Sequence, residues 1–466
     1  MRDNTSHELP AQRRPQVLRL PRRYHLLTLI LRSLMLAVLF LSPLFPLYQL
    51  YLAHPDLPPE SEPRGAAPSP DEAVTGTVPW AARTFTYGIF EDANYAGGPE
   101  DFAITVADLQ ARHFDSILFT NNFTERDEPL LSVADTLGFN VIFAPHAELN
   151  ASWWPEDTPP TLEQARRVIY PLVDQLQGHP SLKGYNILDD APEALGSKAA
   201  LAVEAFRERD PQRPAAPVVI MGHDNVYRQA KPAILLSYIY PSLVVRPPCD
   251  FYEQRGAGAV DGFTERIRQL TDLKSSRVPI WLVLQAHGAT KRYDPHDPDV
   301  TALREPTVEE LRLQHWLALG EGVTGIFWFI YSTQQFWTGL AANPPLLAEV
   351  SDLARRAAPW RSLTPGLRKV ADRVTVSAEA GLSLPFRPYS STLLSSDGKT
   401  YFVVANRSCA PQRLVVTPAD RRRLPGTLRD VETDERFAFG QALRFRGGDG
   451  RLFELVMDAQ DAGRDS

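Results

Sequence analysis

Between residues 85 and 330, short runs of β-branched and aromatic residues alternate with longer stretches whose apolar positions recur every three or four residues. Runs of the first kind predict strands, and stretches of the second kind predict amphipathic helices. The predicted strands are Phe85–Phe90, Ser116–Thr120, Val141–Pro145, Gly184–Leu188, Val218–Met221, Ile234–Tyr240, Ile280–Leu284 and Gly325–Ile330. The predicted helices are Glu100–Arg112, Leu130–Leu137, Leu162–Leu176, Ser197–Arg209, Gly262–Leu273, Val308–Leu319 and Leu346–Ala357. This α/β alternation predicts a parallel sheet closed as a (β/α)8 TIM barrel, with a doubly wound sheet as the alternative.

The helical periodicity stops after Trp360, and short alternating runs separated by turn-forming residues follow. These runs predict a small antiparallel β-sandwich domain over residues 361–460, with a disordered tail at 461–466. Its predicted strands are Val370–Val376, Thr392–Leu394, Tyr401–Val404, Arg413–Thr417, Leu428–Val431 and Leu452–Met457.

The N-terminal region has the charge pattern of a membrane anchor. Residues 1–32 contain seven arginines, and residues 33–53 contain no charged residue. This predicts a basic cytoplasmic tail and one transmembrane helix at 33–53, with the later domains in the periplasm or outside the cell. A cleaved signal peptide ending near Ala53 is the alternative. Residues 54–79 are rich in proline and predict an extended linker to a barrel over residues 80–360.

The formal net charge is -7, so the composition gives no reason to expect a nucleic-acid partner. The chain has two cysteines, Cys249 and Cys409. Two cysteines cannot form a disulfide scaffold or a cysteine-rich zinc site, and we expect unpaired thiols rather than a single bridge.

Candidate chemistry centres on the stretch from Lys183 to Glu193, where an apolar strand runs into Asp189 and Asp190 before Pro192. The C-terminal ends of barrel strands are where TIM barrels place their active sites. The alternative is that Asp190 only caps the following helix. Other acids are expected on the same rim, of which Glu91 is the favoured partner for Asp190 and the others are Glu148 and Asp224.

Three segments together resemble the (β/α)8-barrel glycoside hydrolases, in particular the β-galactosidase-like members of the clan that carries its catalytic acid at the end of strand 4. They are residues 184–192 (Gly-Tyr-Asn-Ile-Leu-Asp-Asp-Ala-Pro), 237–241 (Ser-Tyr-Ile-Tyr-Pro) and 310–329. The resemblance covers residues 84–360 and implies that Asp190 is the acid/base and that Asp189 contacts the sugar. The chain departs from the family by having Gln285 where a retaining enzyme has its nucleophilic glutamate. The usual strand-2 arginine is also absent from residues 118–122.

Several polar and aromatic residues at predicted strand ends are candidates for binding the substrate, because aromatic faces suit the apolar side of a pyranose and histidines hydrogen-bond sugars. Three rim histidines could also hold zinc, but their spacing does not support a metal site, and no metal or cofactor is expected. For Trp328, buried packing is the alternative. The candidates are Asn121, His146, His223, Tyr238, Tyr240, Gln285, His287, Trp328, Tyr331 and Trp337.

The sequence therefore predicts a membrane-anchored, exported glycoside hydrolase-like protein that acts on extracellular or cell-envelope polysaccharide, with Asp190 as general acid. The alternative, favoured by Gln285, is an inactive carbohydrate-binding barrel that assists polysaccharide export or assembly. Hydrolysis normally needs two carboxyl groups, so a second carboxylate across the barrel mouth from Asp190 would discriminate between them.

Overall fold

The computed structural model describes residues 80, 83–92, 95, 97–154, 160–219, 223–241, 257–273, 278–289, 304–334, 337–379, 387–419 and 426–457. The predicted cytoplasmic tail, transmembrane helix and linker, residues 1–79, lie outside these ranges. Within the ranges, no helix is both long enough and apolar enough to cross a membrane.

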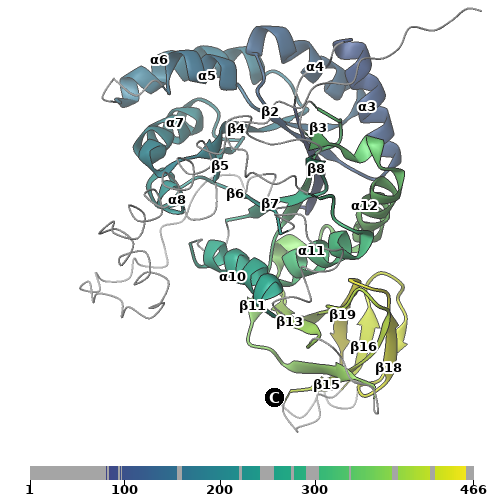
Figure 1. The fold of residues 1–466 in the computed structure, drawn as a ribbon. Helices are drawn as coiled ribbons and strands as arrows, with labels where there is room; N and C mark the ends of the chain where they lie inside the picture. Colours follow the sequence, from purple (N-terminus) through teal and green to yellow (C-terminus); the bar gives the residue numbers. More distant parts are fainter. Residues whose placement is uncertain are drawn as a thin grey trace, which may run out of the picture. The chain divides into compact units, whose positions relative to one another are not determined.

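Eight parallel strands close into a barrel in the order in which they occur along the chain (Figure 1). They are β1 (Thr86–Asp92), β2 (Ser116–Thr120), β3 (Asn140–Phe143), β4 (Leu182–Ala191), β5 (Ala215–Val219), β6 (Leu235–Ile239), β7 (Ile280–Gln285) and β9 (Gly325–Phe329). Each strand pairs in parallel with its neighbours, and β9 closes the barrel against β1. The predicted barrel and all eight of its strands are confirmed.

Helices surround the strands on the outside of the barrel (Figure 1). All seven predicted helices are present, as α3 (Pro99–Ala111), α4 (Thr124–Leu137), α6 (Leu162–Leu176), α7 (Gly196–Arg209), α10 (Ala257–Leu273), α11 (Val308–Gly320) and α12 (Pro344–Ala357). Thr161 and Thr307 form capping boxes that start α6 and α11. Two short helices were not predicted, α5 (His146–Ser152) and α8 (Asn225–Ala230), because neither is long enough to show a helical period.

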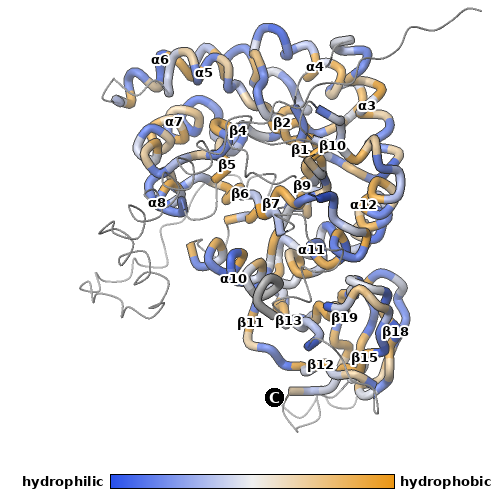
Figure 2. Tube along the Cα trace, in the orientation of Figure 1, coloured by the Kyte–Doolittle hydropathy of each residue, from blue (hydrophilic) through white to orange (hydrophobic). Residues whose placement is uncertain are grey.

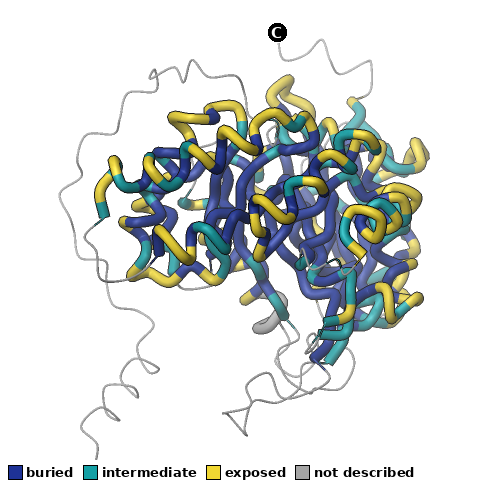
Figure 3. Tube along the Cα trace, turned by 90° about the horizontal axis from the view of Figure 1, so that it is seen from above, coloured by how far each residue is buried: buried dark blue, intermediate teal, exposed yellow. Residues whose placement is uncertain are grey.

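Alternation along the barrel strands separates two apolar layers, since successive side chains point to opposite faces. Phe90, Leu118 and Phe327 belong to the cluster that fills the barrel. The residues directly before them, Ile89, Ile117 and Ile326, point outward and pack in the larger cluster between strands and helices. Figure 2 shows that the strands are mostly hydrophobic and that the helices also carry many hydrophilic residues. Figure 3 shows that the strands are buried inside a ring of partly exposed helices.

The C-terminal part of the chain forms two antiparallel sheets that share an apolar core, as expected for a sandwich. One sheet contains β11 (Arg368–Val370), β13 (Tyr389–Leu394), β14 (Thr400–Ala405), β19 (Gly450–Val456), β16 (Thr427–Asp430) and β17 (Arg436–Phe437), in that order. The other contains β12 (Val374–Ala378), β15 (Gln412–Pro418) and β18 (Ala442–Phe445). The single strand predicted at 370–376 is wrong, because the chain turns at residues 371–373 and β11 and β12 belong to different sheets.

Buried ion pairs join the barrel to these sheets. Arg356 of α12 contacts Glu432 and Asp449, each at 2.9 Å. Asp449 also accepts a hydrogen bond of 2.9 Å from the indole nitrogen of Trp316 on α11. Such pairs are costly to break, because a buried charge then loses its partner.

Cys409, in the loop between β14 and β15, is disulfide-bonded. The only other cysteine of the chain is Cys249, which lies outside the described residues. The expectation of unpaired thiols is therefore wrong. Two isolated cysteines in a sequence do not reveal whether either of them is bonded.

Candidate active site

The end of β4 carries the two adjacent acids in different environments. Asp189 is partly exposed, and the hydroxyl of Thr120 on β2 donates a hydrogen bond of 3.5 Å to its Oδ2. Its other oxygen, Oδ1, is buried without a hydrogen-bond partner. Burial, helped by the neighbouring charge of Asp190, raises the pKa of Asp189 to about 7. Asp189 is therefore a rim carboxyl that can hold a proton near neutral pH.

Asp190 is exposed and adopts a left-handed backbone conformation, with φ of 50°. The strand pairing is irregular here, with register shifts on both sides of Leu188, so that the two acids need not obey simple alternation. Helix α7 begins only at Gly196, and no side chain caps it. The alternative reading of Asp190 as a helix cap is thus wrong.

Glu91, at the end of β1, is almost completely buried, with 1% of its surface exposed. It accepts hydrogen bonds from the backbone N–H groups of Tyr331 and Ser332, at 3.1 and 2.9 Å. Burial raises the pKa of Glu91 to about 8. A general base must reach water or substrate, so this geometry favours a different role, in which Glu91 fastens the loop after β9 to β1.

Asp92 is the next residue of β1. It is partly buried, and it pairs in register with Thr120 of β2. Thr120 is thus linked to Asp92 through the backbone pairing of β1 and β2, and to Asp189 through its hydroxyl group. Asp92 could have been suggested by alternation, because it is two residues after Phe90, whose ring fills the barrel.

Gln285, at the end of β7, is fully buried. Its amide nitrogen donates to the carbonyl oxygens of His287 and Arg304, both at 3.3 Å. Its backbone exchanges two hydrogen bonds with the side chain of Gln314 on α11. These contacts indicate a structural role for Gln285, because they connect the end of β7 to the following loop and to α11.

An aromatic wall, formed by Tyr240, His287, Phe329 and Trp337, lines one side of the mouth. The rings of Tyr240 and Trp337 approach His287 to 5.0 and 4.8 Å, edge to face. Tyr240 also stacks on Phe329 at 5.9 Å, and Tyr238 stacks on Tyr240 at 4.9 Å. The structure thus brings four predicted candidates together and adds Phe329, which was missed because apolar residues near strand ends usually pack in the core.

His287 is neutral in this wall. Its Nδ1 donates to the carbonyl oxygen of Phe329 at 2.9 Å, and burial lowers its pKa to about 4. Its Nε2 is buried without a hydrogen-bond partner. Trp337 lies in β10 (Trp337–Thr338), which pairs with β8 (Gly288–Ala289), so a two-stranded ribbon fixes the outer part of the wall.

His146 and Asn121 meet on the opposite side of the acid-bearing strand, at the ends of β3 and β2. The backbone N–H of Asn121, a residue with φ of 60°, donates to Nδ1 of His146 at 3.3 Å. Burial lowers the pKa of His146 to about 4, against a smaller opposite effect of Asn186. His146 is therefore a neutral group that can donate through Nε2.

Other candidates do not join these groups. Trp328 is fully buried among the residues between strands and helices, so its proposed sugar contact is wrong. The hydroxyl of Tyr331 donates to Asp108 on α3 at 2.6 Å. Three further candidates are occupied by local contacts, namely His223 with the carbonyl of Ala191, Glu148 with the backbone of Thr124, and Asp224 with Arg266. Across the described ranges, no three His, Cys, Asp or Glu side chains gather as a metal site.

Phe123 is a further rim residue that sequence reasoning missed. It lies just before α4, at the end of β2, with 48% of its surface exposed. The guanidinium of Arg126 covers one face of its ring at 4.3 Å. A single exposed apolar ring is ordinary on a protein surface, and its exposure cannot be read from the sequence.

No protein-family model matches the sequence, and a search of curated proteins found no match. Solved structures do match. A glycoside hydrolase family 5 protein from Bacteroides vulgatus is 10% identical, with a TM-score of 0.51 over 83% of this chain and 96% of that one. A β-galactosidase from Rahnella sp. R3 is 7% identical, with a TM-score of 0.55 over 80% and 98%. A further glycoside hydrolase is 10% identical, with a TM-score of 0.53 over 83% and 99%. At these identities the likeness concerns the fold, and the chain has a (β/α)8 glycoside hydrolase-like fold.

Proposed function

We propose that this protein cleaves glycosidic bonds of an extracellular or cell-envelope polysaccharide at the barrel mouth, with Asp189 as the general acid. The observation that carries the proposal is the position of the Asp189 carboxyl at the end of β4, where its Oδ2 contacts Thr120 of β2, and burial there raises its pKa to about 7. Departure of a sugar alcohol needs a proton on the glycosidic oxygen, and a carboxyl group that stays protonated near neutral pH can donate it. This replaces Asp190, which the sequence favoured, by its neighbour.

Asp92 is the proposed general base. Its strand, β1, lies on the other side of β2 from β4, the strand that carries Asp189. In an inverting hydrolase the base activates a water molecule on the far face of the sugar ring. A retaining mechanism with its nucleophile on β7 is not compatible with Gln285, because an amide is not a nucleophilic carboxylate and this one is buried.

The aromatic wall supports a carbohydrate substrate. Tyr240, Trp337 and Phe329 present ring surface beside His287, and aromatic faces pack against the apolar face of a pyranose. His287 and His146 are buried, with 0% and 4% of their surfaces exposed, so the aromatic side chains rather than these histidines are the proposed sugar contacts. Glycoside hydrolases among the structural neighbours agree with this substrate class.

Anchoring in the membrane through residues 33–53, with export of the barrel, remains part of the proposal. The charge-free stretch after an arginine-rich tail supports it. The disulfide at Cys409 agrees with it, because disulfides persist in oxidising compartments such as the periplasm.

A second candidate function is a barrel that binds polysaccharide without cleaving it and assists its export or assembly. One observation favours it, namely that the position expected to carry the nucleophile is the buried amide of Gln285. The wall serves binding and hydrolysis equally.

The test measures release of reducing ends from a panel of exopolysaccharides by the full-length protein and by Asp189→Asn and Asp190→Asn. We expect loss of activity by orders of magnitude in Asp189→Asn, and a smaller loss in Asp190→Asn, which makes the same Asp-to-Asn change one residue away. A larger loss in Asp190→Asn would return the acid to that residue. Retention of a polysaccharide without any cleavage would establish the binding function instead.

A further inference from the structure

The loop after β9 returns to its own start and carries part of the aromatic wall. The backbone N–H groups of Leu340 and Ala341 donate to the carbonyl oxygens of Ile330 and Tyr331, at 2.8 and 2.9 Å. Between these pairs lies Trp337 in β10, which the ribbon partner β8 supports from one side. The place of the Trp337 indole therefore depends also on what holds the neck of the loop, where these hydrogen bonds lie.

Two carboxyl groups from the first β/α unit of the barrel hold this neck. Glu91 at the end of β1 accepts hydrogen bonds from the backbone N–H groups of Tyr331 and Ser332, at 3.1 and 2.9 Å. Asp108 on α3 accepts a hydrogen bond of 2.6 Å from the hydroxyl group of Tyr331. The backbone and the side chain of Tyr331 are thus fixed by different elements, β1 and α3.

Asp108 is itself held in place. Its Oδ2, which accepts from Tyr331, also accepts from the guanidinium Nε of Arg112 at 2.7 Å, one turn later on α3. Although desolvation acts against it, hydrogen bonds from Arg112 and Tyr331 lower the pKa of Asp108, so its carboxylate is ionised at neutral pH. Hydrogen bonds to a charged acceptor are shorter and stronger than neutral ones. The bond between Tyr331 and Asp108 is therefore a strong support for the neck.

We infer that Tyr331 is a positioning residue for the aromatic wall, and that its bond to Asp108 sets the place of Trp337 without contact to the substrate. The ring of Trp337 packs edge to face against His287 and Phe329, with centroids 4.8 and 5.5 Å apart. Such contacts depend on ring orientation, so a shift of the neck changes the surface that a pyranose meets. The inference rests on the proposed role of the wall in binding carbohydrate.

The first test requires no ligand and measures hydrogen exchange of the full-length protein in peptides from residues 330–341. Tyr331→Phe keeps the ring and removes the hydroxyl group, so the N–H groups of Leu340 and Ala341 should exchange about tenfold faster. Asp108→Ala removes the other partner and should have the same effect. The double variant should exchange no faster than either single variant, because both substitutions break one bond. Additive effects, or unchanged exchange in Tyr331→Phe, would overturn the inference.

Tyr170→Phe is the matched control for this substitution. The hydroxyl of Tyr170 on α6 also donates to a carboxylate, that of Glu208 on α7 at 3.0 Å, but at an exposed site on the helices. Its loss should leave exchange in the loop after β9 unchanged. A comparable acceleration would mean that loss of any tyrosine hydroxyl loosens the barrel, and the specific role of Tyr331 would fall.

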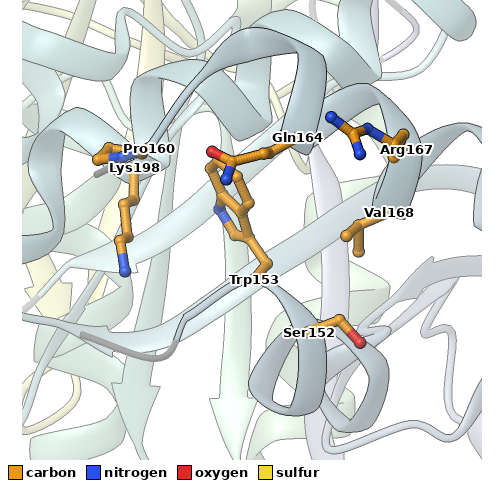
Figure 4. Close-up of a pocket in the computed structure, with 7 residues that line it drawn as sticks. All are labelled: Ser152, Trp153, Pro160, Gln164, Arg167, Val168 and Lys198. Carbon is orange, nitrogen blue, oxygen red and sulfur yellow. The ribbon is translucent and has the colours of Figure 1, made fainter. Parts of the chain in front are cut away.

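A second test follows the Trp337 indole itself, through acrylamide quenching of tryptophan fluorescence. Tyr331→Phe should increase the quenching, and the increase should vanish when both proteins also carry Trp337→Phe. Trp153 is the control indole, because it lines a separate pocket with residues of α6 and α7 (Figure 4) and is only 5% exposed. The increase should persist when both proteins carry Trp153→Phe. An increase that survives Trp337→Phe would show that another indole moves, and the inference would fall.

Kinetics separate positioning from chemistry. Asp189 lies on β4, across the barrel from β9. Tyr331→Phe should therefore raise KM about fivefold for the polysaccharide that the wild type cleaves, and leave kcat within about twofold. A fall in kcat with unchanged KM would overturn the positioning role. Thermal unfolding of each variant identifies effects that come from misfolding.

The inference and the proposed function fail separately. If the wild type cleaves nothing while Tyr331→Phe accelerates exchange and increases quenching at Trp337, the support of the loop by Tyr331 stands and hydrolysis falls. If cleavage requires Asp189 while Tyr331→Phe changes neither exchange nor quenching, hydrolysis stands and the role of Tyr331 falls.

Discussion

Substitution of Glu91 by glutamine tests whether this buried carboxyl is a structural fastener whose charge is costly. Glutamine keeps an oxygen that can accept from Tyr331 and Ser332, but it cannot ionise. Between the ordinary pKa of 4.5 and the folded value of about 8, the folded protein binds a proton at Glu91 that the unfolded chain has released. Unfolding then loses a proton, so stability falls as pH rises through this window.

The magnitude follows from the width of the window. Each pKa unit is worth about 1.4 kcal/mol, so the whole shift corresponds to roughly 5 kcal/mol and the part between pH 4.5 and 7 to roughly 3 kcal/mol. The glutamine variant lacks this dependence. Its stability relative to the wild type should therefore rise by about 3 kcal/mol from pH 4.5 to pH 7, whatever constant cost the extra amide N–H groups bring.

The assay is urea unfolding of the full-length wild type and of Glu91→Gln at half-unit steps between pH 4.5 and 8.5. Comparing the two proteins cancels the contribution of Asp189, whose pKa is raised in the same sense. A free-energy difference between variant and wild type that stays flat from pH 4.5 to 7 would refute the reasoning. It would mean that Glu91 ionises in the fold at an ordinary pKa.

Further predictions concern the acid, the disulfide and the domain junction. Hydrolytic activity should decline as pH rises above about 7, because Asp189 then loses its proton. In Asp190→Asn this decline should move to lower pH, since the charge of Asp190 contributes to the raised pKa of Asp189. A pH–rate profile of Asp190→Asn that matches the wild type would contradict the coupling between the two acids. Cys409→Ser should lower stability by roughly 2–4 kcal/mol, and a reductant should lower the melting temperature of the wild type but not of the variant. Arg356→Met should cost roughly 3–5 kcal/mol in urea unfolding, because the buried carboxylate of Asp449 loses a partner, and a change below 1 kcal/mol would contradict this.

The barrel could be predicted because its strands are buried on both faces and therefore appear as continuous apolar runs. The break between β11 and β12 could not be predicted for a different reason, because the turn at residues 371–373 carries no glycine or proline. Short helices such as α5 and α8 span too few residues for a period to emerge. Strand content was thus easier to predict than the points at which the chain changes sheet.

The sequence predicted which residues lie at the rim of the barrel, but not how buried each of them is or which groups it contacts. The rim position of Asp189 and Asp190 followed from the pattern, whereas the register shifts in β4 decide which of them contacts Thr120. Burial of Trp328 and Gln285 depends on packing against α11 and its neighbours. No pattern in the chain records which face of a strand end reaches water.

The most direct test of the central claim is the crystal structure of Asp189→Asn with an oligosaccharide taken from the polymer that the wild type cleaves. We expect a pyranose ring against Tyr240 or Trp337, with a glycosidic oxygen within hydrogen-bond distance of the residue 189 side chain and the carboxylate of Asp92 facing the opposite side of that ring. An oligosaccharide bound elsewhere, with the barrel mouth empty, would contradict the assignment of the active site.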